Sequence, residues 1–72
     1  MKTRLEKTLV AIRNVADKKG ITLSCKLYYN VKAVARREQF VANIIYHGSH
    51  VHFRTDSMLK SARLALKYVK EL

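Results

Sequence analysis

The N-terminal part of the chain carries apolar side chains at the spacing of a helix. The positions that share one helical stripe are Leu5, Leu9, Ile12 and Ala16. Their separations of four, three and four residues follow the 3.6-residue period of a helix. Thr3 and Glu6 have the spacing of a capping box, and Gly20 fits the left-handed residue that often ends a helix. The pattern predicts a helix over residues 3–19.

The period changes to two after this helix. Apolar and polar side chains alternate over residues 21–32, which is typical of a strand with one buried face. A second alternating run covers residues 38–47 and predicts a second strand. Residues 33–38 between them fit either a loop or the start of a helix, and the return of the alternation favours a connection.

Gly48 and Ser49 separate the second strand from a third. A two-residue connection between alternating runs is a signal for a tight hairpin, with Gly48 taking the positive φ that such a turn needs. The resulting register would pair His47 with His50, Tyr46 with Val51 and Ile44 with Phe53.

A second helix is predicted from Thr55 or Asp56, either of which can cap it, to Leu72. Its broad apolar arc includes Leu59, Ala62, Leu66 and Val69. The order is therefore α-β-β-β-α, in the α+β class. We expect a three-stranded antiparallel sheet with both helices packed on one face, as a single domain over residues 1–72.

Charge narrows the choice of partner. The chain has 15 Lys and Arg against 5 Asp and Glu, a formal net charge of +10. Such a surplus attracts polyanions, so nucleic acid, either RNA or DNA, is the first partner class, ahead of an anionic membrane surface or an acidic protein.

Four cations of the last helix recur on one stripe: Lys60, Arg63, Lys67 and Lys70. A face that served only solubility would usually mix signs, because acid–base pairs stabilise a helix and like charges repel. We therefore expect this stripe to contact phosphates. Lys32, Arg36 and Arg37 in the first connection would extend the basic surface.

Three histidines surround the hairpin turn. His47, His50 and His52 could form a metal site or a nuclease centre, or lie exposed on the outer face of the sheet. No carboxylate or thiol stands near them in sequence, and the single cysteine, Cys25, falls on the apolar side of its strand. The exposed interpretation is favoured, with no metal or cofactor, and His50, His52 and Arg54 would then be free to contact nucleic acid.

The outer face of the predicted sheet also carries Tyr28, Val41 and Ile45 among polar neighbours. A contiguous patch of this kind would suit a protein partner, a homodimer or a platform on which bases stack. A charged first segment and short apolar runs favour a cytoplasmic protein of bacterial or phage type without a membrane span.

The predicted α-β-β-β-α order resembles that of the double-stranded-RNA-binding domain. Lys60 and Ala62 stand where that family's "KKxAK" helix signature places similar residues, with Arg63 one turn further on. Residues 56–59 replace the leading lysines, and the family's Gly-Pro-x-His loop motif has no counterpart in residues 30–38. The resemblance implies duplex binding, with the start of the last helix on major-groove phosphates.

A second, local resemblance is that of Gly48-Ser49-His50 to the catalytic segment of HicA-type toxins, which are small RNases. It implies His50 as the catalytic residue.

We expect a non-enzymatic nucleic-acid-binding protein, with RNA duplex favoured over DNA on topology alone. The alternatives are a small RNase that uses His50 and a phage-type inhibitor that docks on an acidic or nucleic-acid-binding host protein.

Overall fold

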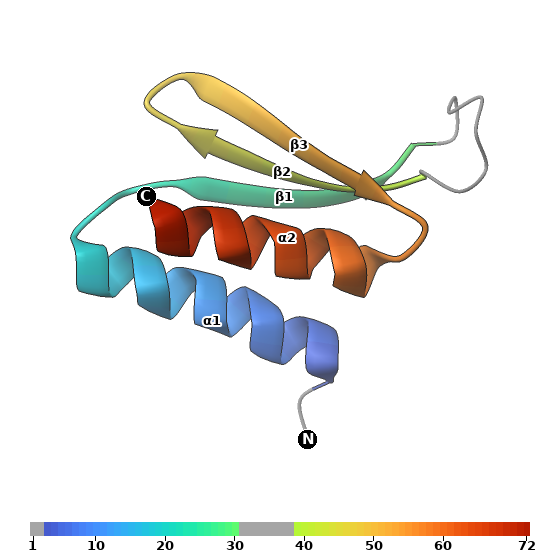
Figure 1. Cartoon of the computed structure of the whole chain (residues 1–72), viewed down its shortest axis with the longest axis horizontal. Coiled ribbons are helices and arrows are strands. Elements are labelled where there is room, and N and C mark those ends of the chain that lie inside the picture. Colours follow the sequence, from blue (N-terminus) through green and yellow to red (C-terminus); the bar gives the residue numbers. More distant parts are fainter. Residues whose placement is uncertain (1–2, 31–38) are drawn as a thin grey trace.

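Two helices flank three strands in the computed structural model, which describes residues 3–30 and 39–72. The elements are α1 (Arg4–Lys19), β1 (Ser24–Tyr29), β2 (Phe40–Tyr46), β3 (Ser49–Thr55) and α2 (Met58–Glu71). This order confirms the predicted α+β class and its α-β-β-β-α arrangement (Figure 1).

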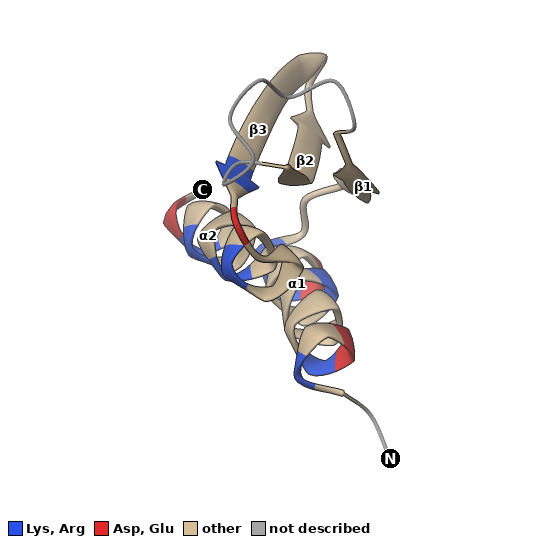
Figure 2. Cartoon of the chain, turned by 90° about the vertical axis from the view of Figure 1, so that its right-hand side faces the viewer, with Lys and Arg blue, Asp and Glu red and all other residues tan. Residues whose placement is uncertain are grey.

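The strands form one antiparallel sheet in the order β1-β2-β3, so β2 is central. Both helices lie on the same side of it, as the end-on view makes plain (Figure 2). They are not equivalent, because α2 packs directly on β2 and β3 whereas α1 packs mainly on α2. Neither helix among the described residues is long and apolar enough to cross a membrane.

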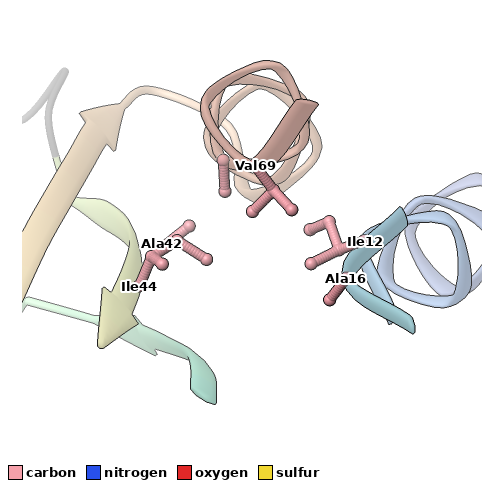
Figure 3. Close-up of a cluster of buried hydrophobic side chains, with 6 residues drawn as sticks. Ile12, Ala16, Ala42, Ile44 and Val69 are labelled. Carbon is pink, nitrogen blue, oxygen red and sulfur yellow. The ribbon is translucent and has the colours of Figure 1, made fainter. Parts of the chain in front are cut away.

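The core lies where α1, α2 and β2 meet. Its buried cluster consists of Ile12, Ala16, Ala42, Ile44, Ala65 and Val69 (Figure 3). Alanines on all three elements allow close approach, and the branched side chains fill the remaining space. Phe53 of β3 adds an aromatic contact with Tyr68 of α2, with ring centroids 5.7 Å apart.

The ends of α1 follow the prediction. The Glu6 backbone N–H donates to the Thr3 hydroxyl oxygen at 3.1 Å, which confirms the first half of the capping box. Gly20 has φ 67°, and its N–H binds the Ala16 and Asp17 carbonyls. The Ile21 N–H also binds the Ala16 carbonyl, at 3.1 Å, so Ile21 belongs to the helix end. For this reason β1 begins at Ser24 rather than at Ile21.

The β2–β3 turn differs from the prediction. Its two turn residues are His47 and Gly48, with φ of 51° and 79°, and Tyr46 pairs with Ser49. The predicted pairing of His47 with His50 is wrong, and so are the pairings of Tyr46 with Val51 and of Ile44 with Phe53, because Ile44 faces Val51 and Ala42 faces Phe53.

The physical reason lies in the turn and in the packing beneath it. Histidine enters the left-handed region more readily than most residues, so His47-Gly48 supplies two positive φ values where the prediction used one. The observed register also sets the large Phe53 beside the small Ala42 on the face that α2 covers. Because the shift is two residues, each side chain of β3 keeps its predicted face.

The start of α2 also differs from the prediction. Ser57 is the N-cap residue and makes no side-chain capping bond, so the predicted caps, Thr55 and Asp56, are wrong. Asp56 instead accepts from Lys60 Nζ at 3.0 Å. The Thr55 hydroxyl oxygen accepts from the Ser57 N–H at 3.1 Å, which ties the end of β3 to the helix. The question whether residues 33–38 form a loop or a helix lies outside the described residues.

Candidate nucleic-acid interface

The cationic stripe of α2, defined as Lys60, Arg63, Lys67 and Lys70, is exposed along its whole length. At 3.6 residues per turn its members fall within an arc of about 80° and span about 15 Å of helix axis. The buried side of α2 carries Ser61, Ala62, Ala65 and Val69. The stripe therefore points away from the core and from the sheet.

Most of the charge on the stripe is free to meet a ligand. Lys60 pairs with Asp56 at 3.0 Å, but both side chains are more than half exposed, so this contact is worth well under about 1 kcal/mol. Within residues 3–30 and 39–72, Arg63, Lys67 and Lys70 have no ion pair. Three adjacent unpaired cations favour a polyanion over a point charge.

Three of the remaining cationic candidates, all on β3, do not join this surface. His50, His52 and Arg54 alternate along β3 with Val51 and Phe53, which face the helices. They therefore lie on the outer face of the sheet, whereas the stripe lies on the side of α2 that faces away from the sheet. Lys32, Arg36 and Arg37, which were expected to extend the stripe, lie outside the described residues. The described cationic candidates therefore lie on two surfaces, the stripe of α2 and the outer face of the sheet.

Nine positions make up the outer face: Ser24, Lys26, Tyr28, Val41, Asn43, Ile45, His50, His52 and Arg54. None of the nine is acidic. Across the strands Lys26, Asn43 and His52 form one row, and Tyr28, Val41 and Arg54 form the next. The face therefore combines the cations Lys26 and Arg54 with the aromatic rings of Tyr28, His50 and His52.

The centre of this face holds a polar group that has no hydrogen-bond partner among residues 3–30 and 39–72. Asn43 is only 7% exposed, and its Oδ1 is buried without a hydrogen bond. An unpaired buried amide oxygen costs about 1–3 kcal/mol. Sequence analysis missed Asn43 and Lys26 as functional candidates. The alternation put both on the polar side, but nothing local showed that Asn43 sits on the central strand between two cation-bearing edges.

The histidines do not converge. His50 and His52 are neighbours on β3, and their rings are nearly parallel. His47 lies in the turn, and the centroid of its ring is 4.1 Å from that of the Tyr46 ring. No group of three His, Cys, Asp or Glu side chains in the described residues could hold a metal ion. The structure therefore brings two of the three histidines together as a pair of flat rings.

The apolar patch predicted on the same face is smaller than expected. Val41 is fully buried, Ile45 is half-buried, and Tyr28 is 40% exposed. Val41 is on the central strand, between Tyr28 and Arg54 in the register. These two side chains are exposed, whereas Val41 is not. Tyr28 is thus the main apolar surface that this row offers.

A separate groove of about 470 Å³ opens between α1 and β1. It exists because α1 packs mainly on α2, so the face of β1 that points toward the helices is only partly covered. Ile12 and Leu23 line it, with Arg13 and Asp17 among the polar lining residues. Cys25 also lines the groove, and burial raises the pKa of its thiol, as expected for a half-buried cysteine that faces the core.

No family model, no curated protein and no solved structure matches this chain. The observed topology is compatible with that of the double-stranded-RNA-binding domain, and this likeness extends to the order and pairing of the elements only. Functional assignment therefore depends on the surfaces described above.

Proposed function

We propose that this chain is a non-enzymatic nucleic-acid-binding protein that holds phosphates on the cationic stripe of α2. The observation that carries the proposal is the exposed, one-signed stripe, with three of its four cations unpaired among the described residues. Its charge density suits the closely spaced phosphates of a nucleic-acid backbone.

A duplex is the ligand that best suits a straight helical stripe. Four cations along about 15 Å of a rigid helix can reach several phosphates without bending the ligand. Such contacts position the protein and carry no sequence information. The topological likeness favours RNA duplex over DNA. We expect binding that depends little on base sequence.

The test is a charge reversal on the stripe. In the variant Arg63→Glu, Lys67→Glu, Lys70→Glu, affinity for an RNA duplex should fall roughly 100-fold or more, because three attractive contacts become repulsive. Fluorescence anisotropy measures the affinity, and circular dichroism checks that the helices remain. Lys60 is left unchanged because Lys60→Glu would set two acids against each other at positions 56 and 60.

A matched control separates the stripe from net charge. The variant Lys7→Glu, Arg13→Glu, Lys19→Glu changes the charge equally, and all three positions are exposed and off α2. Its affinity for the same duplex should fall less than about tenfold. Equal losses in the two variants would mean that charge acts nonspecifically and would remove the stripe from the proposal.

The RNase alternative has its own assay. It assigns chemistry to His50, whose neighbours on the outer face of the described residues are His52 and Ile45, with no carboxylate at any of the nine positions. Labelled RNA incubated with excess protein should stay intact. Cleavage by the wild type that His50→Ala abolishes would replace the binding proposal with an enzymatic one.

A further inference from the structure

The rings of His50 and His52 stand side by side on the outer face of the sheet, and the space between them is called the slot here. Their centroids are 6.4 Å apart and their planes differ by only 18°. A flat ring in van der Waals contact with both would need about 7 Å, twice the contact distance of about 3.5 Å. An opening of a few tenths of an ångström would therefore admit one aromatic ring.

Strand geometry explains why the slot has this width. Residues two apart on a strand point to the same side and are separated by about 6.6 Å. Phe53 packs against the core on the opposite face, and Val51, the partner of buried Ile44, points the same way, which fixes the backbone that carries both histidines. The slot is thus held by the core, while the two imidazole rings remain exposed.

A hydrogen-bonding group lies beside the slot. Asn43 is the β2 partner of His52, and its buried Oδ1 lacks a hydrogen bond. A carboxamide offers one acceptor and two donors, the complement of the edge of a nucleobase. Because Oδ1 is buried, contact with a base requires the Asn43 side chain to turn outward, and the hydrogen bond gained with a base amino group would offset the cost of leaving Oδ1 unpaired.

The charges around the slot suit a phosphate. Lys26 is the β1 partner of Asn43, and Arg54 follows His52 on the same face of β3. No acidic residue occupies any of the nine outer-face positions. A nucleotide combines the three features that this surface would bind: a flat ring for the slot, a hydrogen-bonding base edge for the Asn43 amide, and a phosphate for the two cations.

We propose that the outer face of the sheet binds an unpaired nucleotide of a single-stranded nucleic acid. The base inserts between His50 and His52, its edge meets the Asn43 amide, and its phosphates lie near Lys26 and Arg54. A duplex cannot use this slot, since its bases are already paired and stacked. The site goes beyond the duplex contact proposed for α2 and lies on the other side of the molecule (Figure 1).

The test compares two strands of equal length and charge, a single-stranded oligoadenylate and the same backbone without bases. Wild-type protein should prefer the strand with bases. The variant His50→Ala, His52→Ala should bind oligoadenylate roughly 5- to 100-fold more weakly, the range expected for the loss of base stacking, and bind the abasic strand as before. Anisotropy gives both affinities.

Two variants act as controls. His47→Asn removes a histidine from the same hairpin but off the slot, and asparagine accepts the positive φ of this position, so the variant should leave the preference unchanged. His50→Phe, His52→Phe keeps two flat rings and should restore most of the affinity lost in the double alanine variant. Equal binding of the two strands by the wild type would overturn the proposal, as would an unchanged preference in the double alanine variant.

The two proposals can fail separately. Arg63→Glu, Lys67→Glu, Lys70→Glu should keep the ratio of oligoadenylate to abasic affinity while it loses duplex binding. Loss of that ratio would show that the slot is not an independent site. Unchanged duplex affinity would instead count against the stripe and leave the slot intact. Free adenosine monophosphate should compete weakly, and affinity equal to that of the strand would exclude a single-stranded polymer as the ligand.

Discussion

At the scale of single residues, Ser61 shows how one polar side chain joins three elements. It is fully buried, and its hydroxyl donates to the Phe40 carbonyl at 2.8 Å. The Thr55 hydroxyl lies 2.8 Å away on its other side. Ser61 on α2 therefore meets the first residue of β2 and the last of β3, and the sequence showed only a serine within an apolar arc.

Ser61→Ala should lower the free energy of unfolding by about 1–2 kcal/mol, because the Thr55 hydroxyl and the Phe40 carbonyl lose a buried partner. Urea denaturation followed by circular dichroism measures the change. Ser57→Ala is the matched control, since the Ser57 side chain makes no capping bond, and it should have a much smaller effect. Comparable losses in both variants would contradict a structural role for the Ser61 hydroxyl.

At the scale of elements, the β2–β3 hairpin shows that the alternation of apolar and polar residues predicts which face a side chain takes but not which residues pair. The alternation correctly assigned Asn43, His52 and their neighbours to the outer face. It did not set the register, because shifts of two residues satisfy the same alternation. The turn decided the register, and the choice between His47-Gly48 and Gly48-Ser49 depended on a histidine at positive φ and on packing under α2.

The same turn gives a prediction of opposite sign at two adjacent positions. His47→Asn should stabilise the hairpin by a few tenths to about 1 kcal/mol, because Asn-Gly is the preferred pair for two positive φ values. Gly48→Ala should destabilise it by about 1–2 kcal/mol. An added Cβ at Gly48 meets nothing within 4 Å, so this cost is conformational. Denaturation midpoints that move in the same direction would contradict the turn assignment.

At the scale of the whole molecule, the described cations lie on both sides of the sheet. The helices carry most of the described cations, including the cationic stripe (Figure 2). The sheet carries Lys26 and Arg54. Two ligand surfaces back to back would allow one chain to hold a duplex and an unpaired strand together.

The dependence of duplex affinity on salt concentration measures how many phosphates the stripe contacts. If its four cations contact phosphates, the log–log slope of duplex affinity against salt should be roughly −3 to −4. Arg63→Glu, Lys67→Glu, Lys70→Glu should flatten the slope by about three. Anisotropy titrations at several salt concentrations provide the slopes. A variant slope equal to that of the wild type would place the phosphate contacts elsewhere.

The elements, the inward faces and the cap of α1 were readable from the sequence, and so was the grouping of Lys60, Arg63, Lys67 and Lys70. These features depend on residues a few positions apart, whose relation is set by the 3.6- and 2-residue periods. The sequence also determined the surplus of positive charge, since composition needs no fold.

Only the tertiary structure decided how distant segments meet. It set the register of β3, packed α1 on α2 and left Asn43 Oδ1 without a partner. It also placed the two basic surfaces on opposite sides of the molecule and brought the His50 and His52 rings into parallel. The reason is that these outcomes depend on packing between residues far apart in the chain, which a local period does not encode.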